Sequence, residues 1–134
     1  MTMRKASCSC GQLTLTVEGE PVRVAVCHCF SCQRRTGSAY GVQARFRSDQ
    51  VVEKVGRTQT YAYKGDSGST HPMHRCADCG STVYWDPNGT GEFVIVALGA
   101  FGDLEFPAPT VAVYGESRRY AWLPVPETIT THWG

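Results

Sequence analysis

Short segments that alternate apolar and polar residues run along most of the chain. Residues 12–17 have leucine or valine at every second position, and residues 22–26 repeat the pattern with valine up to Cys27. Because successive side chains of a strand point to opposite faces of a sheet, both segments are predicted to be half-buried β-strands. The turn-forming residues Gly19-Glu20-Pro21 lie between them, which predicts a hairpin.

Strand-like segments continue through the rest of the chain. They cover residues 40–46, 50–54, 58–63, 82–85, 93–98 and 111–114, with glycine, proline, aspartate and asparagine between them. Residues 33–38 predict a turn or a single helical turn, and no segment has an apolar stripe of helical period and length. Loops are predicted over residues 65–69 and over the proline-rich residues 106–126. The first is expected to be a solvated connection, with a loop that covers a site as the alternative. The sequence therefore predicts a mostly β fold.

Size, composition and charge narrow the class of protein. A chain of 134 residues can build one hydrophobic core but not two ordinary ones, so residues 1–134 are expected to form a single domain. The net charge is +1 and no run of lysine or arginine exceeds a pair, which argues against a basic nucleic-acid-binding face. We find neither a signal peptide nor an apolar segment of membrane-spanning length, so a cytoplasmic protein without a membrane partner is expected.

Cysteine is the residue type that points to chemistry. The chain has seven: Cys8, Cys10, Cys27, Cys29, Cys32, Cys76 and Cys79. A reducing cytoplasm keeps thiols free, and clustered thiols there are metal ligands or catalysts more often than disulfides. The odd number also argues against complete pairing as disulfides.

Two short motifs have the spacing of a structural zinc site. In Cys76-Ala-Asp-Cys79-Gly80, two intervening residues let both thiolates point at one ion, and the glycine permits the backbone conformation that completes the turn. A tetrahedral site needs two further ligands, which Cys8-Ser-Cys10-Gly11 can supply from one face of an extended segment. These four cysteines are predicted to close one structural site.

The remaining three cysteines lie together in Cys27-His28-Cys29-Phe30-Ser31-Cys32. Three protein ligands with a vacant fourth position are typical of catalytic zinc, and four plus three ligands account for all seven cysteines. An alternative is a zinc ribbon formed by Cys29, Cys32, Cys76 and Cys79 alone, which would leave three thiols in metal-like spacings without a metal.

The histidines are expected to lie outside both sites. His28 stands between two candidate ligands, so on an extended segment its ring should point away from Cys27 and Cys29 and serve packing or outer hydrogen bonding. His71 and His74 precede the second cysteine pair and are expected to be surface or hydrogen-bonded residues, and His132 indicates little.

The order Cys-x-Cys-Gly, Cys-His-Cys-x-x-Cys-x-x-x-x-Gly-Ser and Cys-x-x-Cys-Gly resembles the glutathione-dependent formaldehyde-activating enzyme family, which includes centromere protein V. The resemblance spans residues 7–85 and extends over residues 93–122. It implies a β-tent fold of small antiparallel sheets around two zinc ions. It also implies a structural site matching Cys8, Cys10, Cys76 and Cys79 and a catalytic site matching Cys27, Cys29 and Cys32.

The family's activity is a carbon-sulfur lyase reaction in the synthetic direction, which joins glutathione and formaldehyde into S-(hydroxymethyl)glutathione. The resemblance therefore implies a glutathione-like thiol and a small aldehyde as substrates. Glutathione carries two carboxylates, and Arg34 and Arg35 are candidates to bind them because an arginine fork grips a carboxylate bidentately. Ser38 and Tyr40 are further rim candidates, and Tyr84 and Trp85 are expected in the core.

Two other functions stay open at this point. The chain could be a binding module whose metals only hold a β scaffold, as the kinship with centromere protein V allows. Alternatively, Cys27, Cys29 and Cys32 could buffer metal or react with oxidants, because clustered thiolates of low pKa oxidise readily. The three-thiolate cluster favours the enzyme, because a purely structural site would be filled by a fourth protein ligand.

Overall fold

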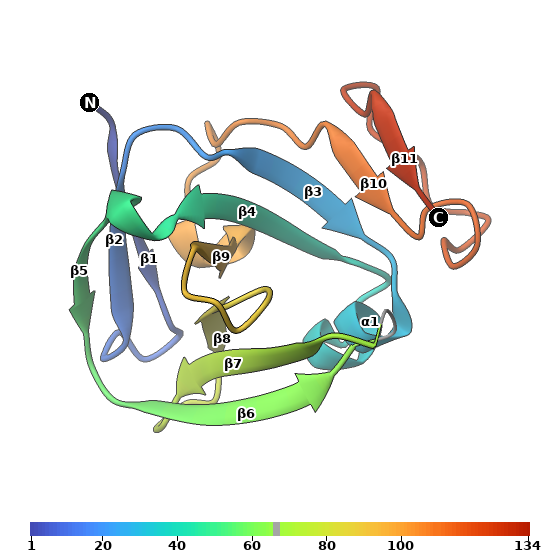
Figure 1. Cartoon of the computed structure of the whole chain (residues 1–134). Coiled ribbons are helices and arrows are strands. Elements are labelled where there is room, and N and C mark those ends of the chain that lie inside the picture. The colour runs from blue at the N-terminus through green and yellow to red at the C-terminus, as the bar shows by residue number, and fades with distance from the viewer. Residues whose placement is uncertain (66–67) are drawn as a thin grey trace.

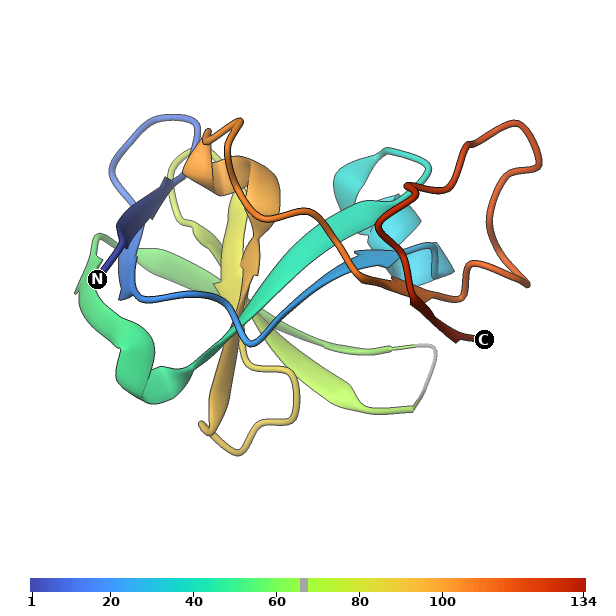
Figure 2. The same ribbon diagram turned by 90° about the horizontal axis from the view of Figure 1, so that it is seen from above.

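The computed structural model describes residues 1–65 and 68–134 of a mostly β chain (Figure 1). In chain order the elements are β1 (Met3–Ser7), β2 (Thr14–Glu18), β3 (Arg23–Cys27), α1 (Phe30–Thr36), β4 (Gly41–Arg47), η1 (Ser48–Gln50), β5 (Val51–Val55), β6 (Thr58–Lys64), β7 (Thr70–Cys76), β8 (Thr82–Trp85), β9 (Phe93–Ala97), η2 (Leu98–Phe101), β10 (Val111–Val113) and β11 (Thr131–Trp133). The two ends of the chain lie at opposite ends of the molecule (Figure 2). In the described part of the chain, no helix is long and apolar enough to cross a bilayer.

The described strands form two sheets. A three-stranded sheet has the order β1-β2-β5, and an eight-stranded sheet has the order β11-β10-β3-β4-β9-β8-β7-β6. All pairs are antiparallel except β3 with β10 and β10 with β11, which run parallel. The mostly β prediction is confirmed, and the parallel pairing at this one edge is a departure from the antiparallel sheets that the resemblance implies.

The core lies between the two sheets. Leu15 and Val17 of the first sheet, with Leu13 just before β2, join Phe46 and Val96 of the second sheet in one cluster of fully buried side chains. Side chains alternate between the two faces of a strand, so every second residue of β2, β4 and β9 points into this core. Burying these side chains is the main stabilising contribution that holds the small sheet against the large one.

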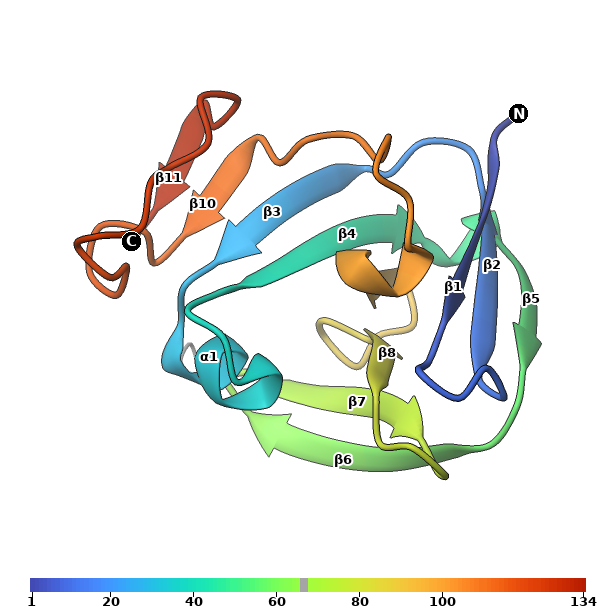
Figure 3. The same ribbon diagram turned by 180° about the vertical axis from the view of Figure 1, so that it is seen from behind.

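The opposite face of the large sheet carries the residues that alternate with the core positions. Gln43 and Arg45 of β4, Ile95 of β9 and Trp85 of β8 line a common cavity there with Cys27, the last residue of β3. Helix α1 lies at the end of this sheet, where β3 ends and β4 begins (Figures 1 and 3). The fold thus separates a packed face from a face that holds polar and thiol groups.

The hairpin predicted from residues 12–17 and 22–26 is wrong, because β2 and β3 belong to different sheets. The turn residues between them carry the chain from one sheet to the other. The buried amide of Gln50 holds this crossing: its Nε2 donates to the carbonyl oxygens of Glu18 at 3.0 Å and Glu20 at 2.8 Å. Its Oε1 accepts a hydrogen bond from the backbone N–H of Arg47 at 2.9 Å.

Several other observed elements differ from the predicted ones in number or in length. Strands β1, β7 and β11 were not predicted, because β1 buries only Ala6 fully, β7 contains Pro72, and β11 is three residues long. The helical turn predicted over residues 33–38 is a seven-residue helix that begins earlier, at Phe30. Strand β10 lies within the predicted loop 106–126, as the strand-like pattern of residues 111–114 indicates.

Part of the loop predicted over residues 65–69 lies outside the described residues, namely 66 and 67. The described residues on either side connect β6 to β7, and the backbone N–H of Gly65 donates to the carbonyl oxygen of Ser69 at 2.7 Å. Both of these residues line the cavity on the second face of the large sheet. The described part of the loop thus reaches this cavity at Gly65 and Ser69, which favours the alternative of a loop beside a site over a purely solvated connection.

We predict that Gln50→Leu lowers the free energy of unfolding by roughly 2 to 4 kcal/mol, because it leaves two partly buried carbonyls and one N–H without their partners. Urea denaturation measures the change. Gln59→Leu is the matched control, since Gln59 is exposed on β6 and should alter stability little. Equal stabilities of the two variants would contradict the role assigned to Gln50.

Candidate metal centre

The first cysteine group begins in the turn between β1 and β2. The backbone N–H of Cys8 donates to the carbonyl of Leu13 at 3.0 Å, and that of Gly11 donates to the carbonyl of Cys8 at 3.2 Å. Gly11 has a φ of +84°, a conformation that glycine adopts at no steric cost. The tight turn brings the sulfurs of Cys8 and Cys10 to 3.7 Å from each other.

The turn between β7 and β8 supplies the other two sulfurs. Gly80 has a φ of +80°, and its N–H donates to the carbonyl of Cys76 at 3.0 Å. The backbone N–H groups of Asp78 and Cys79 both donate to the sulfur of Cys76 at 3.3 Å. These N–H donors stabilise a thiolate at Cys76.

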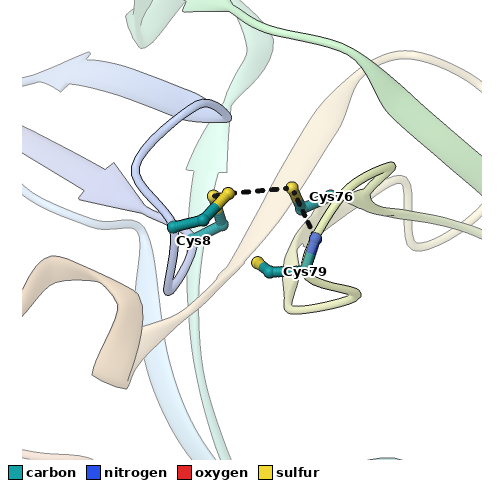
Figure 4. A group of neighbouring side chains, drawn as sticks. Cys8, Cys76 and Cys79 are labelled. Atoms are coloured by element: carbon teal, nitrogen blue, oxygen red, sulfur yellow. Dashed lines mark hydrogen bonds between the residues drawn. The ribbon is translucent and has the colours of Figure 1, made fainter.

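The two turns meet across the gap between the sheets (Figure 4). The sulfurs of Cys10 and Cys76 lie 3.7 Å apart, and the ligand atoms of all four cysteines lie within 4.8 Å of one another. Gln12 fastens the junction, since its Nε2 donates to the sulfur of Cys76 at 3.0 Å and to the carbonyl of Arg57 at 2.8 Å. These four cysteines could therefore hold one metal ion.

The spacing of the sulfurs fits a tetrahedral thiolate site. Zinc–sulfur bonds of about 2.3 Å in a tetrahedron separate the sulfurs by about 3.8 Å, close to the 3.7 Å of the Cys8–Cys10 and Cys10–Cys76 pairs. Hydrogen bonds from the hydroxyl and backbone of Ser81 lower the pKa of Cys79 to about 5, which favours its thiolate. The donor set and its spacing are those that zinc prefers.

The second group forms where β3 passes into α1. Cys27 ends β3, Cys29 is the N-cap of α1, and Cys32 lies in its first turn. The Cys29 sulfur accepts a hydrogen bond from the backbone N–H of Cys32 at 3.3 Å, and the N–H of His28 donates to the carbonyl of Val113 at 2.9 Å. The three sulfurs lie within 4.8 Å of one another and all three residues are buried.

The three buried thiols differ in pKa, because each hydrogen-bonds with the other two. Hydrogen bonds from Cys27 and Cys32 lower the pKa of Cys29 to about 2, while hydrogen bonding to Cys29 and Cys32 raises the pKa of Cys27 far above its ordinary value. For Cys32, the contact with Cys27 favours the thiolate, but the hydrogen bond with Cys29 and burial outweigh it and raise the pKa to about 11. Ionising all three thiols together therefore requires a cation among them.

The trio opens into a cavity of about 440 Å³. Its wall is formed by α1, by strands β3, β4, β7, β8, β9 and β10, by the end of β11 and by the loops around Gly65 and Pro87. The lining residues beyond the cysteines are Ser31, Gln43, Arg45, Gly65, Ser69, His71, Trp85, Pro87, Asn88, Ile95, Val113, Tyr114, Trp133 and Gly134. Within residues 1–65 and 68–134, no fourth side chain of metal-binding type has a ligand atom within 4.8 Å of all three sulfurs.

The partition into four and three cysteines is thus the one that spacing predicted. The zinc-ribbon alternative is wrong, because Cys29 and Cys32 belong to a different group from Cys76 and Cys79. The contrast between the groups is chemical: one has the four sulfurs of a closed site, and the other has three sulfurs beside a cavity large enough for a small molecule.

Known proteins resemble the chain in sequence and in fold. A sequence model of the glutathione-dependent formaldehyde-activating enzyme family matches residues 3–117. The chain belongs to this family. A crystal structure of a Rhodobacter sphaeroides protein has the same fold, with a TM-score of 0.55 and 21% identity over 78% of this chain and 91% of that one. No curated protein sequence matches this chain.

Both cysteine groups lie inside the range matched to the glutathione-dependent formaldehyde-activating family, together with most of the cavity wall. Trp133 and Gly134 of the wall lie beyond it.

The histidines lie outside both cysteine groups, as expected. His28 is buried, its ring is tilted against that of Tyr40 at 6.1 Å, and burial lowers its pKa. His74 stacks on Tyr84 at 5.0 Å, while His71 lines the wall of the cavity. His132 lies in β11.

The two arginines predicted to bind carboxylates do not line the cysteine cavity. Arg34 is exposed and lies over the ring of Phe30 at 5.7 Å. Arg35 stacks on Trp85 at 4.7 Å, lies against Gly41 next to Cys32, and has a charge that favours the Cys32 thiolate. Both border a neighbouring cavity of about 430 Å³ that also includes Arg75.

The other candidates are distributed between rim and core. Ser38 is exposed in the loop after α1, and Tyr40 contacts His28 rather than the cysteine cavity. Tyr84 is buried in the main core as expected, whereas Trp85 is buried but also forms part of the cavity wall.

Sequence reasoning missed Gln43 and Arg45. The signal was present, because residues 40–46 were predicted as a strand and these two alternate with the apolar Val42, Ala44 and Phe46. Such alternation assigns the two polar residues to one face. It does not reveal that this is also the face of Cys27, which depends on the pairing of β3 with β4.

Alanine at one cysteine of each group should have different consequences. Structural zinc contributes roughly 10 to 16 kcal/mol to folding, as much as the whole stability of an ordinary domain. Cys79→Ala should therefore leave the chain unfolded, whereas Cys29→Ala should keep the fold and lose one metal ion. Circular dichroism and metal analysis by mass spectrometry measure the two outcomes. A folded Cys79→Ala variant that retains two metals would refute the assignment.

Proposed function

We propose that the chain is a zinc-dependent enzyme that joins a glutathione-like thiol to a small aldehyde. The observation that supports it most directly is the trio of buried sulfurs at the wall of a cavity, without a fourth side-chain ligand among the described residues. Family membership supports the same reaction. We take residues 1–134 as one domain, because the main core cluster contains side chains from both sheets.

Cys8, Cys10, Cys76 and Cys79 would hold the structural zinc, and Cys27, Cys29 and Cys32 would hold the catalytic zinc. When bound by the trio, zinc would supply a positive charge that favours the thiolate form of an incoming thiol. The buried side chains of Trp85 and Ile95 exclude water from the cavity wall, which strengthens electrostatic interactions inside it. Arg35 adds positive charge beside Cys32.

The proposed reaction forms one carbon–sulfur bond. The thiol sulfur supplies the electron pair to the carbonyl carbon, the π pair of the C=O bond moves to oxygen, and the proton lost by the thiol ends on that oxygen. With glutathione and formaldehyde the product is S-(hydroxymethyl)glutathione, and the step needs no oxidant or reductant. The reverse step breaks the same bond, which is a carbon-sulfur lyase reaction.

Cobalt substitution tests the proposal, because the absorption of tetrahedral cobalt(II) responds to its ligands. We expect glutathione to change the spectrum of one of two cobalt ions and Cys29→Ala to remove that response. The rate of hydroxymethyl-thiol formation, followed by NMR, should then fall to the uncatalysed rate. Ser38→Ala is the control, because Ser38 is exposed and does not line the cavity.

Two cobalt ions that ignore every thiol would instead favour a metal-stabilised binding module. A Cys29→Ala variant that retains both metals and full activity would overturn the catalytic role of the trio.

A further inference from the structure

Two arginines face each other on the cavity side of the large sheet. Arg23 of β3 is directly opposite Arg45 of β4 in the antiparallel register. Both residues are half-buried, and Arg45 lines the cysteine cavity. Like charges directly opposite each other destabilise a sheet, so this pair has a cost that the fold itself does not require.

Neither arginine has a carboxylate partner within ion-pair distance among residues 1–65 and 68–134. The Nε of Arg45 is buried without a hydrogen-bond acceptor, and the charge of Glu92 reaches Arg45 only from beyond that distance. Burial lowers the pKa of both guanidinium groups, and the charge of Arg23 lowers that of Arg45 further. A half-buried guanidinium without a carboxylate partner is stabilised by a bound anion.

Two other arginines of the chain have carboxylate partners. Arg57 forms an ion pair with Asp78, and Arg47, two residues after Arg45 on β4, forms one with Asp49 at 3.1 Å. Arg45 instead lies over the ring of Phe93 at 4.9 Å and Arg23 over that of Trp133 at 4.7 Å. Arg35 and Arg75 lie over aromatic rings in the same way beside the neighbouring cavity. Stacking fixes the planes of the two guanidinium groups and leaves their N–H edges available to a ligand.

The register also places the pair relative to the trio. Cys27 is opposite Gly41, and Arg45 is four residues farther along β4 on the same face. Four residues of strand span about 13 Å, and the long arginine side chain reaches across part of that distance. A ligand with its sulfur at the trio would therefore meet Arg45 only with a group several bonds away from the sulfur.

We propose that Arg45, supported by Arg23, binds a carboxylate of the substrate and selects thiols whose negative charge lies several bonds from the sulfur. This inference rests on the proposed function, because it places the sulfur at the trio. It assigns binding of the substrate carboxylate to Arg45, which lines the cysteine cavity, instead of Arg34 or Arg35, which border the neighbouring cavity. Arg45 is thus a specificity-determining residue.

The test compares Arg45→Gln with the matched control Arg47→Gln on the same strand. Affinities of the cobalt-substituted proteins are measured for glutathione, for neutral 1-thioglycerol, and for mercaptoacetate, whose carboxylate is too close to its sulfur to reach Arg45. Loss of a charge-assisted contact should weaken glutathione binding by roughly 10- to 100-fold in Arg45→Gln. Binding of the two other thiols, and all binding by Arg47→Gln, should stay unchanged.

Equal weakening of all three thiols in Arg45→Gln would overturn the inference, because it would indicate general damage to the cavity. Unchanged glutathione binding would overturn it as well. A melting curve checks the fold of the variant, which should be no less stable than the parent because a like-charge pair has been removed.

S-methylglutathione separates this inference from the proposed function, since it keeps both carboxylates but has no thiol. Calorimetry should detect its binding to the parent and to Arg47→Gln, with a loss of roughly 10- to 100-fold in Arg45→Gln. If no thiol perturbs the cobalt but S-methylglutathione still depends on Arg45, the proposed function fails and the carboxylate site stands. If thiols perturb the cobalt and neither glutathione ligand depends on Arg45, the reverse holds.

Discussion

The junction of two cysteine-bearing turns constrains the rest of the structure. Sulfurs from residues 66 positions apart in the chain lie 3.7 Å from each other, and two further sulfurs lie within 4.8 Å. Thiolates at such distances repel unless a cation neutralises them. One turn belongs to the small sheet and the other to the large sheet, so a cation there would tie the sheets together above their shared core.

Because the small sheet packs against one face of the large sheet, the two faces of the large sheet carry different kinds of side chain. One face packs Ala44, Phe46 and Val96 against the small sheet, and its positions obey the rules of a stable core. The other face lies outside this contact and carries Cys27, Gln43 and Arg45. A period of two residues thus lets the same strands serve stability on one side and chemistry on the other.

The spacing and number of the cysteines were sufficient to predict the cysteine groups, whereas pairing between distant strands was not predictable from local sequence. The pairs Cys29–Cys32 and Cys76–Cys79 have the same spacing, and it is the count of all seven cysteines that favours a group of four and a group of three, the grouping that the structure has. The turn at Gly19-Glu20-Pro21 indicates a change of direction but not which sheet the next strand joins. The crossing is held by Gln50, whose side-chain amide donates hydrogen bonds to carbonyl oxygens 30 or more positions away.

The same limit explains why Arg34 and Arg35 were favoured over Arg45. Proximity in sequence to Cys32 suggested proximity to the cavity, but a helical turn carries both side chains toward another surface. Arg45 is 13 positions away from Cys32 and reaches the cavity because β3 and β4 pair in antiparallel register. Residues that approach a site through a sheet leave no local motif, only the alternation that assigns them to one face.

Two departures from local rules lie at the cavity. Among the described non-glycine residues, Tyr114 alone has a positive φ, at 56°, and its side chain lines the cavity beside the trio. Arg23 and Arg45 oppose like charge across two strands, and the Nε of Arg45 is buried without an acceptor. Strain and unpaired charge persist where the surrounding structure fixes them, and they are characteristic of functional sites. The core face of the same strands shows neither feature, so these costs belong to the cavity and what it binds rather than to the fold.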